Sequence, residues 1–488
     1  MANASLHVWP RVEEFIDRTA ELDRLEAWWA GDERMPVNLY GRRRVGKSWL
    51  LRRFAHGKPA VLFVAERLAE GAQLNRFAEQ LTPLLNGVAP DLPDVATLFR
   101  VLFRLARDQK VLAVIDEFPW LLGTTSKEVD RTLSAIQAVM EEERDRSRLK
   151  LVVCGSAVTQ MEALQAERSP LHGRLLPLEL RALPYRRAVQ FLDGDDAQDR
   201  FVRFAVAGGM PRYLAALAGG DLRTRVCDQI LRPDAPLWNE GRTIVGQELR
   251  EPAMHFSVLE QLAGGEKQVG ELAEALRSKS APVSKYLSLL ADLRLVRKQL
   301  PYGASPTDRG SHWGIEDPFL RFWFRFVFPF QADLEAGLEP SDLFDSAIAP
   351  ELATHVAPVF EDLCREHVRA TMGALATRVG RWWGNSLNKL RRSGQRTTEE
   401  IDIVGTARKR VTLVGEAKWT SRPLGERILH DLADYKVPAL VQDGFKLASE
   451  PTTVLFSRSG YSDGLRARAE GDDKLVLVNV DDLLSTLD

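Results

Sequence analysis

Cysteine is scarce in this sequence, which has only Cys154, Cys227 and Cys364 among its 488 residues. Three distant thiols exclude a disulfide framework and a CxxC metal site, and they favour a reducing, cytoplasmic compartment. The eight histidines form no HxH or HxxxH pair, so we expect no zinc site. Residues 1–14 lack the basic and apolar regions of a signal peptide. No apolar run approaches the ~20 residues of a membrane helix, so we expect no membrane contact.

An excess of charge of one sign is also absent. The 66 Lys and Arg residues nearly balance the 68 Asp and Glu residues, which leaves a net charge of −2. This balance excludes a histone-like nucleic-acid binder and an acidic tail, but it is compatible with a local basic groove. The length predicts about three domains, and a chain of this size with 45% hydrophobic residues can bury several cores.

Short apolar strands alternate with helical stretches in the first 235 residues. The strand candidates are rich in Val, Ile and Leu and lack polar alternation, which is typical of strands buried on both faces. They are Val37–Tyr40, Ala60–Val64, Val111–Ile115 and Leu151–Cys154. The pattern predicts an α/β fold with a parallel sheet, followed by helices over residues 180–235.

A phosphate-binding loop follows the first strand. Residues 41–48, GRRRVGKS, satisfy the pattern GxxxxGK[ST] between a strand and a helical run. Gly41, Arg44 and Gly46 belong to the loop whose backbone N–H groups would surround phosphates. Lys47 would reach the β- and γ-phosphates, and Ser48 would bind Mg²⁺. The alternative is a chance match, which the strand–loop–helix context disfavours.

Polar residues follow the third and fourth strands. Asp116 suits the outer shell of Mg²⁺, and Glu117 suits a base that orients the attacking water; the alternative is a solvated acidic turn. Ser156 could contact the γ-phosphate or the water, although serine also forms turns at strand ends. Arg174 could stabilise transition-state charge, and an ordinary surface arginine is an equal alternative.

Six short motifs follow one another in the N-terminal half of the chain: FIDRTAELDRL (15–25), LYGRRRVGKS (39–48), VIDEFPWL (114–121), CGSAVTQM (154–161), SPLHGR (169–174) and GGMPRYL (208–214). Together they resemble the archaeal-type ATPases, a branch of the STAND and AAA+-like P-loop ATPases. The resemblance implies that ATP is the nucleotide, that Asp17, Arg18 and Thr19 lie near the adenine pocket, and that Ser156 is a sensor. It also implies a helical lid, so that the ATPase domain with its lid would span residues 1–235.

Residues 245–330 predict three helical stretches, a short strand at Val296–Leu300 and an aromatic-rich segment, Asp317–Phe330. Apolar residues recur at helical spacing over 281–293, while Ser284 and Lys285 lie off the stripe. This pattern is typical of a winged helix, whose second helix can enter a major groove; the alternative is a domain that only packs on its neighbours. We expect the aromatic residues to form a core or an interface, and residues 331–350 to be a connector.

Residues 351–488 predict a third, α/β domain with candidate metal ligands. Glu361 lies on a helical stretch, Asp402 on a strand, and Glu416 and Lys418 on the same side of the next strand. Two carboxylates with a third from a helix can hold Mg²⁺ at a phosphodiester, and Lys418 can orient water or stabilise developing charge. The alternative is an exposed strand with alternating charges.

The order Glu…Asp…ExK resembles the restriction-endonuclease-like PD-(D/E)XK nucleases. The phrases GRWWG (380–384), EIDIV (400–404) and GEAKW (415–419) resemble a C-terminal region found joined to these ATPases. Ile401 stands where the nucleases usually have proline, but no position needed for metal binding is lost.

A local basic stretch favours nucleic acid as a partner. The stretch from Arg381 to Thr398 contains five basic residues, Arg381 included, and no acid, and Trp382 and Trp383 adjoin these residues. Basic groups near aromatic rings suit a phosphate-lined surface, and Arg391 and Arg392 are its candidate DNA contacts. The alternative is a solvated loop.

Two functions follow from these motifs. The first is an ATP-hydrolysing enzyme that acts on double-stranded DNA, in which ATP gates a metal-dependent nuclease domain. The second is a STAND-type, ATP-driven switch whose C-terminal domain binds nucleic acid or a partner without cleaving it. Both predict ATP and Mg²⁺ as ligands, and the sequence leaves the oligomeric state open, a homo-oligomer included.

Overall fold

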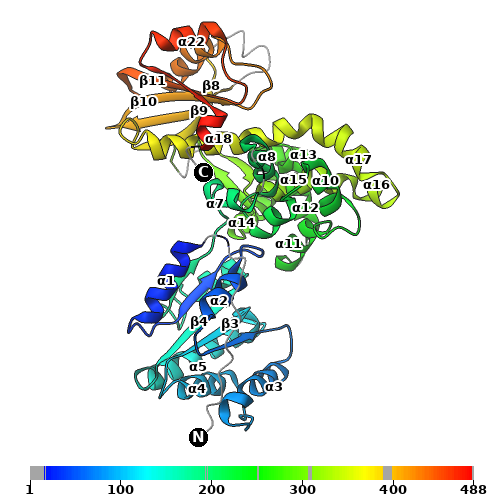
Figure 1. Ribbon diagram of the computed structural model, residues 1–488, viewed down its shortest axis with the longest axis vertical. Helices are drawn as coiled ribbons and strands as arrows, with labels where there is room; N and C mark the ends of the chain where they lie inside the picture. Colours follow the sequence, from blue (N-terminus) through cyan, green and yellow to red (C-terminus); the bar gives the residue numbers. More distant parts are fainter. Residues whose placement is uncertain are drawn as a thin grey trace. The chain divides into compact units, whose positions relative to one another are not determined.

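The chain divides into two compact units. The computed structural model describes residues 16, 18–192, 194, 196–249, 252–305, 310–387 and 398–485. The first unit comprises residues 1–182 and 210–212, and the second comprises residues 183–209 and 213–488. Each unit contains a five-stranded sheet of its own, and Figure 1 labels elements of both, among them β3, β4, β9 and β10.

A parallel five-stranded sheet forms the centre of the first unit. The strand order is β2-β3-β4-β1-β5, and every neighbouring pair is parallel. The strands are β1 (Val37–Tyr40), β2 (Ala60–Val64), β3 (Val111–Asp116), β4 (Leu149–Gly155) and β5 (Leu176–Glu179). The four strands predicted from apolar runs are confirmed. The apolar pattern does not predict β5, because this edge strand is short, contains a proline and is only partly buried.

Helices connect these strands and cover the sheet. They are α1 (Thr19–Ala30), α2 (Lys47–Ala55), α3 (Glu70–Leu81), α4 (Val95–Leu105), α5 (Ser126–Glu143) and α6 (Val158–Ala163). Two of them begin at side-chain caps: Asp94 accepts a hydrogen bond from the N–H of Thr97 at α4, and a capping box of Thr125 and Glu128 starts α5. These caps satisfy backbone donors that the helices themselves leave unpaired.

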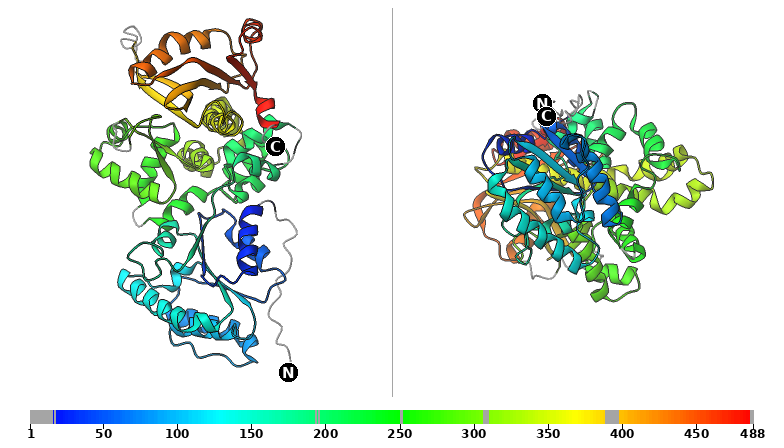
Figure 2. Two further views of the ribbon diagram at one scale, coloured as in Figure 1. Left: turned by 90° about the vertical axis from the view of Figure 1, so that its left-hand side faces the viewer. Right: turned by 90° about the horizontal axis from the view of Figure 1, so that it is seen from below.

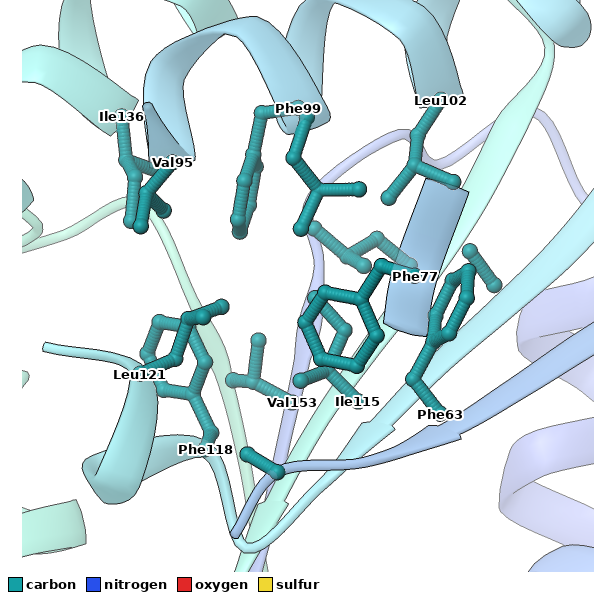
Figure 3. Close-up of a cluster of buried hydrophobic side chains, with 14 of the residues drawn as sticks. Phe63, Phe77, Val95, Phe99, Leu102, Ile115, Phe118, Leu121, Ile136 and Val153 are labelled. Carbon is teal, nitrogen blue, oxygen red and sulfur yellow. The ribbon is translucent and has the colours of Figure 1, made fainter. Parts of the chain in front are cut away.

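One hydrophobic core joins α3, α4 and α5 to the sheet. In Figure 3, Val95, Phe99 and Leu102 point from α4 toward the side chains of the sheet, among them Ile115 and Val153. All five side chains are buried. Because this packing fixes the strands, it also fixes the carboxyl ends of β1, β3 and β4, where the phosphate loop and the acidic residues lie.

Helices predominate in the chain that follows β5, as the sequence predicts. They are α7 (Tyr185–Ala188), α8 (Ala197–Ala207), α9 (Pro211–Leu217), α10 (Leu222–Val226) and α11 (Glu240–Glu248). Further along the chain, α15 (Pro318–Phe326) carries most of the aromatic-rich segment. Its apolar side chains are buried, which confirms the expectation that they form a core.

A helix–helix–strand–strand module lies between α11 and α15. Its elements are α12 (Pro252–Ala263), α13 (Val269–Ala275), α14 (Ser280–Asp292), β6 (Val296–Gln299) and β7 (His312–Ile315), and β6 pairs with β7 in antiparallel fashion. The predicted stripe on α14 is confirmed at Val283, Leu287 and Leu290, which are fully buried. This element order is the one expected of a winged helix, and we call residues 252–315 the wing module.

A mixed sheet forms the C-terminal part of the second unit. Its order is β12-β11-β10-β9-β8, with antiparallel pairing from β8 to β10 and parallel pairing from β10 to β12. The strands are β8 (Arg378–Asn385), β9 (Thr398–Ala407), β10 (Arg410–Lys418), β11 (Leu447–Ser457) and β12 (Leu475–Asn479). The strands predicted to carry Asp402 and, next to it, Glu416 and Lys418 are confirmed as β9 and β10, whereas the sequence pattern does not predict β8.

Helices cover both faces of this sheet. The long helix α18 (Leu352–Thr371) packs on one face, and Figure 2 shows it, in yellow, seen end-on against the sheet. The other face is covered by α21 (Val437–Gln442) and α22 (Asp463–Glu470). Further helices among the described residues of this part are α20 (Arg427–Asp431) and α23 (Val480–Ser485). The α/β class predicted for residues 351–488 is therefore confirmed.

The segment expected to be a connector is helical instead. It contains α16 (Gln331–Glu335), α17 (Pro340–Leu343) and a π-helical turn, Phe344–Ile348. Leu334, Leu343 and Ile348 are buried, so these short helices are held by packing, which a sequence pattern over a few residues does not show. Among the described residues, no helix is both long enough and apolar enough to cross a membrane.

Candidate functional site

The phosphate loop has a backbone that requires glycine at defined positions. A Cβ added to Gly41 would lie 2.2 Å from the carbonyl oxygen of Leu180, so no larger residue fits there without a shift of the backbone. Gly46 has φ of +100° and caps the N-terminus of α2, a conformation that glycine adopts without strain. The loop therefore leads directly into a helix N-terminus, which is an arrangement suited to phosphate.

The side chain of Lys47 folds back over this loop. Its Nζ donates hydrogen bonds to the carbonyl oxygens of Gly41, at 2.7 Å, and Arg42, at 3.2 Å. The side chain is buried, and this burial lowers the pKa of Lys47 below its ordinary value, although Cys154, Glu117 and Asp116 oppose the shift. The ammonium group is thus held inside the loop, where phosphate oxygens could replace the two carbonyls.

Four polar residues beside the loop are linked by hydrogen bonds. The Oγ of Ser48 donates to Asp116 at 2.9 Å, and the Oγ of Ser156 lies 3.0 Å from both carboxylate oxygens of Glu117. Glu117 has φ of +53°, and its N–H donates to Asp116 at 3.0 Å. The structure therefore brings together Ser48, Asp116, Glu117 and Ser156, as an Mg²⁺–nucleotide site requires.

Two arginines singled out from the sequence have definite partners. Arg174 makes an ion pair with Glu141 at 2.7 Å, on α5. Arg18 is buried and donates to the carbonyl oxygens of Val45, at 2.9 Å, and Arg181, at 2.7 Å. Arg18 thus contacts the phosphate loop through the backbone of Val45, while Asp17 lies outside the described residues.

Three carboxylates converge in the C-terminal sheet. Glu361 from α18 and Glu400 and Asp402 from β9 place one oxygen each within 4.8 Å of one another. Burial, and then the charge of Asp402, raises the pKa of Glu361 to about 8. We call these three residues the carboxylate cluster. Oxygen donors at such distances suit Mg²⁺ or Mn²⁺, so the residues present fit a divalent cation.

The remaining predicted ligand, Glu416, is held by two lysines. Lys418 contacts Asp402 at 2.6 Å and Glu416 at 2.7 Å, and Lys436 donates to the other oxygen of Glu416 at 2.6 Å. Burial opposes ionisation of Asp402, but the charge of Lys418 holds its pKa below the ordinary value. Burial and Asp402 raise the pKa of Glu416. The structure therefore brings Glu361, Asp402 and Lys418 together and places Glu416 between the lysines.

Sequence reasoning missed three contributors to this region. Glu400 lies two residues before Asp402 on one strand, so the two-residue period of a strand could have indicated it. Lys436 comes from a π-helical turn, Leu432–Lys436, and no local motif marks it. Arg381 donates to Glu400 and, at 2.6 Å, to Glu266 of the wing module.

The aromatic residues beside the basic stretch do not form an exposed stacking surface, contrary to expectation. Trp382 is fully buried and donates to Asp443 at 2.9 Å, and Trp383 stacks on His312 with ring centroids 4.8 Å apart. Both residues belong to β8, and both side chains are buried. Of the predicted DNA contacts, Ser284 is half-buried and Lys285 exposed on α14, while Arg391 and Arg392 lie outside the described residues.

Comparison with known proteins identifies the nucleotide-binding part. Residues 15–217 match a family described as an ATPase domain predominantly from Archaea. The chain carries an archaeal-type P-loop ATPase domain. Residues 323–429, which include the carboxylate cluster, Glu416 and Lys418, match a second family, described as archaeal and bacterial proteins of unknown function.

Several known proteins are similar to this chain over part or most of its length. An uncharacterised protein of Methanocaldococcus jannaschii is 25% identical over 443 residues, which are 88% of this chain and 91% of that protein. An uncharacterised ATP-binding protein of the same organism is 43% identical over 44 residues, or 9% of this chain and 75% of that protein. The structure of a Walker-type ATPase of Pyrococcus abyssi aligns with a TM-score of 0.50 and 18% identity, over 66% of this chain and 99% of that one. The similarity to this last protein is a similarity of fold alone.

Proposed function

We propose that the protein is an ATP-dependent enzyme that cleaves double-stranded DNA with the help of a divalent cation, and that nucleotide binding controls the cleavage. The observation that carries this proposal is the convergence of Glu361, Glu400 and Asp402 within 4.8 Å, beside Lys418, in a chain that also carries an ATPase domain. An ATPase alone has no need of a second cluster of carboxylates, one buried and two half-buried, next to a lysine.

The residues of the ATPase domain have roles in nucleotide chemistry. Lys47 would bind the β- and γ-phosphates, Ser48 and Asp116 would hold Mg²⁺, and Glu117 would orient the attacking water. Ser156 contacts both oxygens of Glu117, so it can position this carboxylate or report on the γ-phosphate. The hydrogen bonds that link Ser48 to Asp116 and Ser156 to Glu117 support these roles.

The carboxylate cluster has the groups needed at a phosphodiester. A divalent cation bound there supplies Lewis-acid chemistry, which polarises a phosphoryl oxygen and activates water. Lys418 lies against Asp402 at 2.6 Å, where its ammonium group can stabilise negative charge that develops on phosphate oxygens. The ammonium group stays positively charged, because Asp402 and Glu416 raise the pKa of Lys418 despite its burial.

DNA would reach the protein over the exposed face of α14. Lys285 is exposed on this helix, and a lysine at such a position can contact phosphates without sequence preference. The basic residues Arg391 and Arg392 are further candidates for the same role. The near-neutral total charge does not oppose this proposal, because a local excess of basic residues is enough for non-specific binding.

A STAND-type switch is the second candidate function, and one observation favours it. Glu416 contacts both Lys418 and Lys436, so its charge is compensated by the protein's own side chains. A carboxylate so engaged is a weaker ligand for a cation than a free one. In that case the C-terminal sheet would bind nucleic acid or a partner, and ATP would change the state of the protein without cleavage.

A nuclease assay separates the two functions. Supercoiled plasmid is incubated with the full chain and Mg²⁺ or Mn²⁺, with and without ATP. Wild type, Lys47→Ala and Asp402→Asn are compared with two exposed matched controls, Arg52→Ala on α2 and Glu366→Gln on α18. The nuclease function is supported if wild type and both controls nick or linearise the plasmid, if Asp402→Asn does not, and if cleavage by Lys47→Ala does not respond to ATP. Cleavage that persists in Asp402→Asn, or its absence in wild type, refutes it.

A further inference from the structure

The wing module is joined to the C-terminal sheet along β8. The N–H of Tyr302 donates to the carbonyl oxygen of Arg381 at 2.8 Å, and the hydroxyl of Tyr302 lies 2.6 Å from that of Thr406. On the same strand, Trp383 stacks on His312 and donates to the carbonyl oxygen of Gly310 at 3.1 Å. Backbone and aromatic contacts of this kind fix the position of β8 relative to β6 and β7.

One side chain of β8 joins the two parts electrostatically. Arg381 donates from Nη1 to Glu266 of the wing module at 2.6 Å, and from Nε to Glu400 of the carboxylate cluster. Glu266 is held on its other oxygen by Gln299 of β6. The side chains of Arg381 and Glu266 are 20% and 22% exposed, so solvent screens this pair only partly.

We propose that Arg381 is a positioning residue that links the wing module to the carboxylate cluster and sets the affinity of the cluster for a divalent cation. The proposal rests on the cation site proposed above, because it concerns the regulation of that site. Arg381 competes with the cation for Glu400, and Glu266 draws the guanidinium group away from the cluster. A ligand that moves the wing module therefore changes how strongly Arg381 opposes cation binding.

The charges give opposite signs for the two partners of the pair. Removing the positive charge of Arg381 leaves three carboxylates with one competitor fewer, so cation binding tightens. Without the negative charge of Glu266, Arg381 interacts with Glu400 alone, and the charge of Glu266 no longer attracts the cation from a distance. Cation binding therefore weakens. A purely structural ion pair would not behave in this way, because loss of either partner would weaken the fold and the site together.

Direct Mn²⁺ titration of the full chain tests the proposal, with bound and free Mn²⁺ distinguished by electron paramagnetic resonance. Every sample carries the background substitution Lys47→Ala and contains no nucleotide, so that the ATPase site does not contribute to Mn²⁺ binding. We expect roughly tenfold tighter Mn²⁺ binding in Arg381→Gln and roughly tenfold weaker binding in Glu266→Gln. Arg381→Lys keeps the positive charge but not the contacts through two nitrogens, so its Mn²⁺ affinity should lie between those of wild type and Arg381→Gln.

A matched ion pair of the second unit provides the control. Arg325 pairs with Glu351 at 2.8 Å, on elements other than the cluster and the wing, and Glu351→Gln should leave Mn²⁺ binding unchanged. Thermal unfolding of each variant shows whether it folds. If the background protein binds no Mn²⁺, the proposed cation site fails and the link fails with it. If it binds Mn²⁺ but Arg381→Gln and Glu266→Gln shift the affinity in the same direction or leave it unchanged, only the link is overturned.

Discussion

The phosphate loop and the carboxylate cluster of this protein are built in opposite ways. The loop consists of consecutive residues, 41–48, whose function depends on backbone conformation at glycines and on one lysine. The cluster combines side chains from α18 and β9, and three basic residues from β8, β10 and a π-helical turn balance the acidic groups of the region. The phosphate contacts of the loop are therefore supplied mainly by its own residues, whereas the cluster also responds to charges that other elements supply.

The largest expected effect is on nucleotide binding at the local site. Lys47→Ala removes the ammonium group that lies within the loop, so we expect ATP binding to weaken about 1,000-fold because charge-assisted contacts with two phosphates are lost. Isothermal titration calorimetry measures the affinity, and Arg52→Ala, an exposed change on the same helix, should bind ATP as wild type does. A loss of less than about tenfold would show that the loop does not depend on this lysine.

Glycine is the next test of the loop. Gly41→Ala places a methyl group 2.2 Å from the carbonyl oxygen of Leu180, and the neighbour is backbone that cannot move aside cheaply. We expect a loss of about 3–4 kcal/mol in the free energy of unfolding of the first unit. Gly71→Ala in α3 is the matched control, because nothing lies within 4 Å of its added Cβ; it should be neutral or slightly stabilising. Urea denaturation of both variants measures the difference, and equal stabilities would contradict the steric argument.

The sequence predicts the local site far better than the assembled one. Residues 41–48 have a spacing whose chemistry is contained in the motif, and apolar runs predict four of the five strands around them. Glu361, Asp402 and Lys418 are also predicted from their order along the chain, and the structure brings them together. Glu400 could have been inferred from the two-residue period it shares with Asp402. Arg381 is missed because its role depends on the register of β8 against β9, where Trp383 pairs with Glu400, and no pattern within one segment encodes that register.

Lys436 shows how the assembled site depends on a distant element. It lies in a π-helical turn, Leu432–Lys436, and its ammonium group contacts the fully buried Glu416 at 2.6 Å. Lys436→Met leaves that carboxylate with one lysine partner, so we expect a loss of about 2–3 kcal/mol in unfolding free energy near pH 8. The exposed Lys446→Met should cost less than about 0.5 kcal/mol. If adding Glu416→Gln to Lys436→Met restores no stability, the loss does not come from the unpaired charge.

The smallest expected effect is a pH dependence at the cluster. Burial and Asp402 raise the pKa of Glu361 in the folded protein to about 8, above the ordinary value near 4.3 of an unfolded chain. Between these values the folded state binds more protons than the unfolded state, so the free energy of unfolding falls as pH rises through this window. Because the side chain is partly exposed, we expect Glu361→Gln to abolish a decrease of only about 1–2 kcal/mol between pH 5 and pH 8. Chemical denaturation across this range measures the slope, with Glu366→Gln as the exposed control on the same helix.

A divalent cation favours the ionised carboxylate, so Mg²⁺ should also flatten the slope in wild type and in Glu366→Gln but not change Glu361→Gln. A slope that persists unchanged in Glu361→Gln would assign the pH dependence to another group. The carboxylate cluster would then lack the raised pKa that distinguishes it from the phosphate loop, where burial lowers the pKa of Lys47.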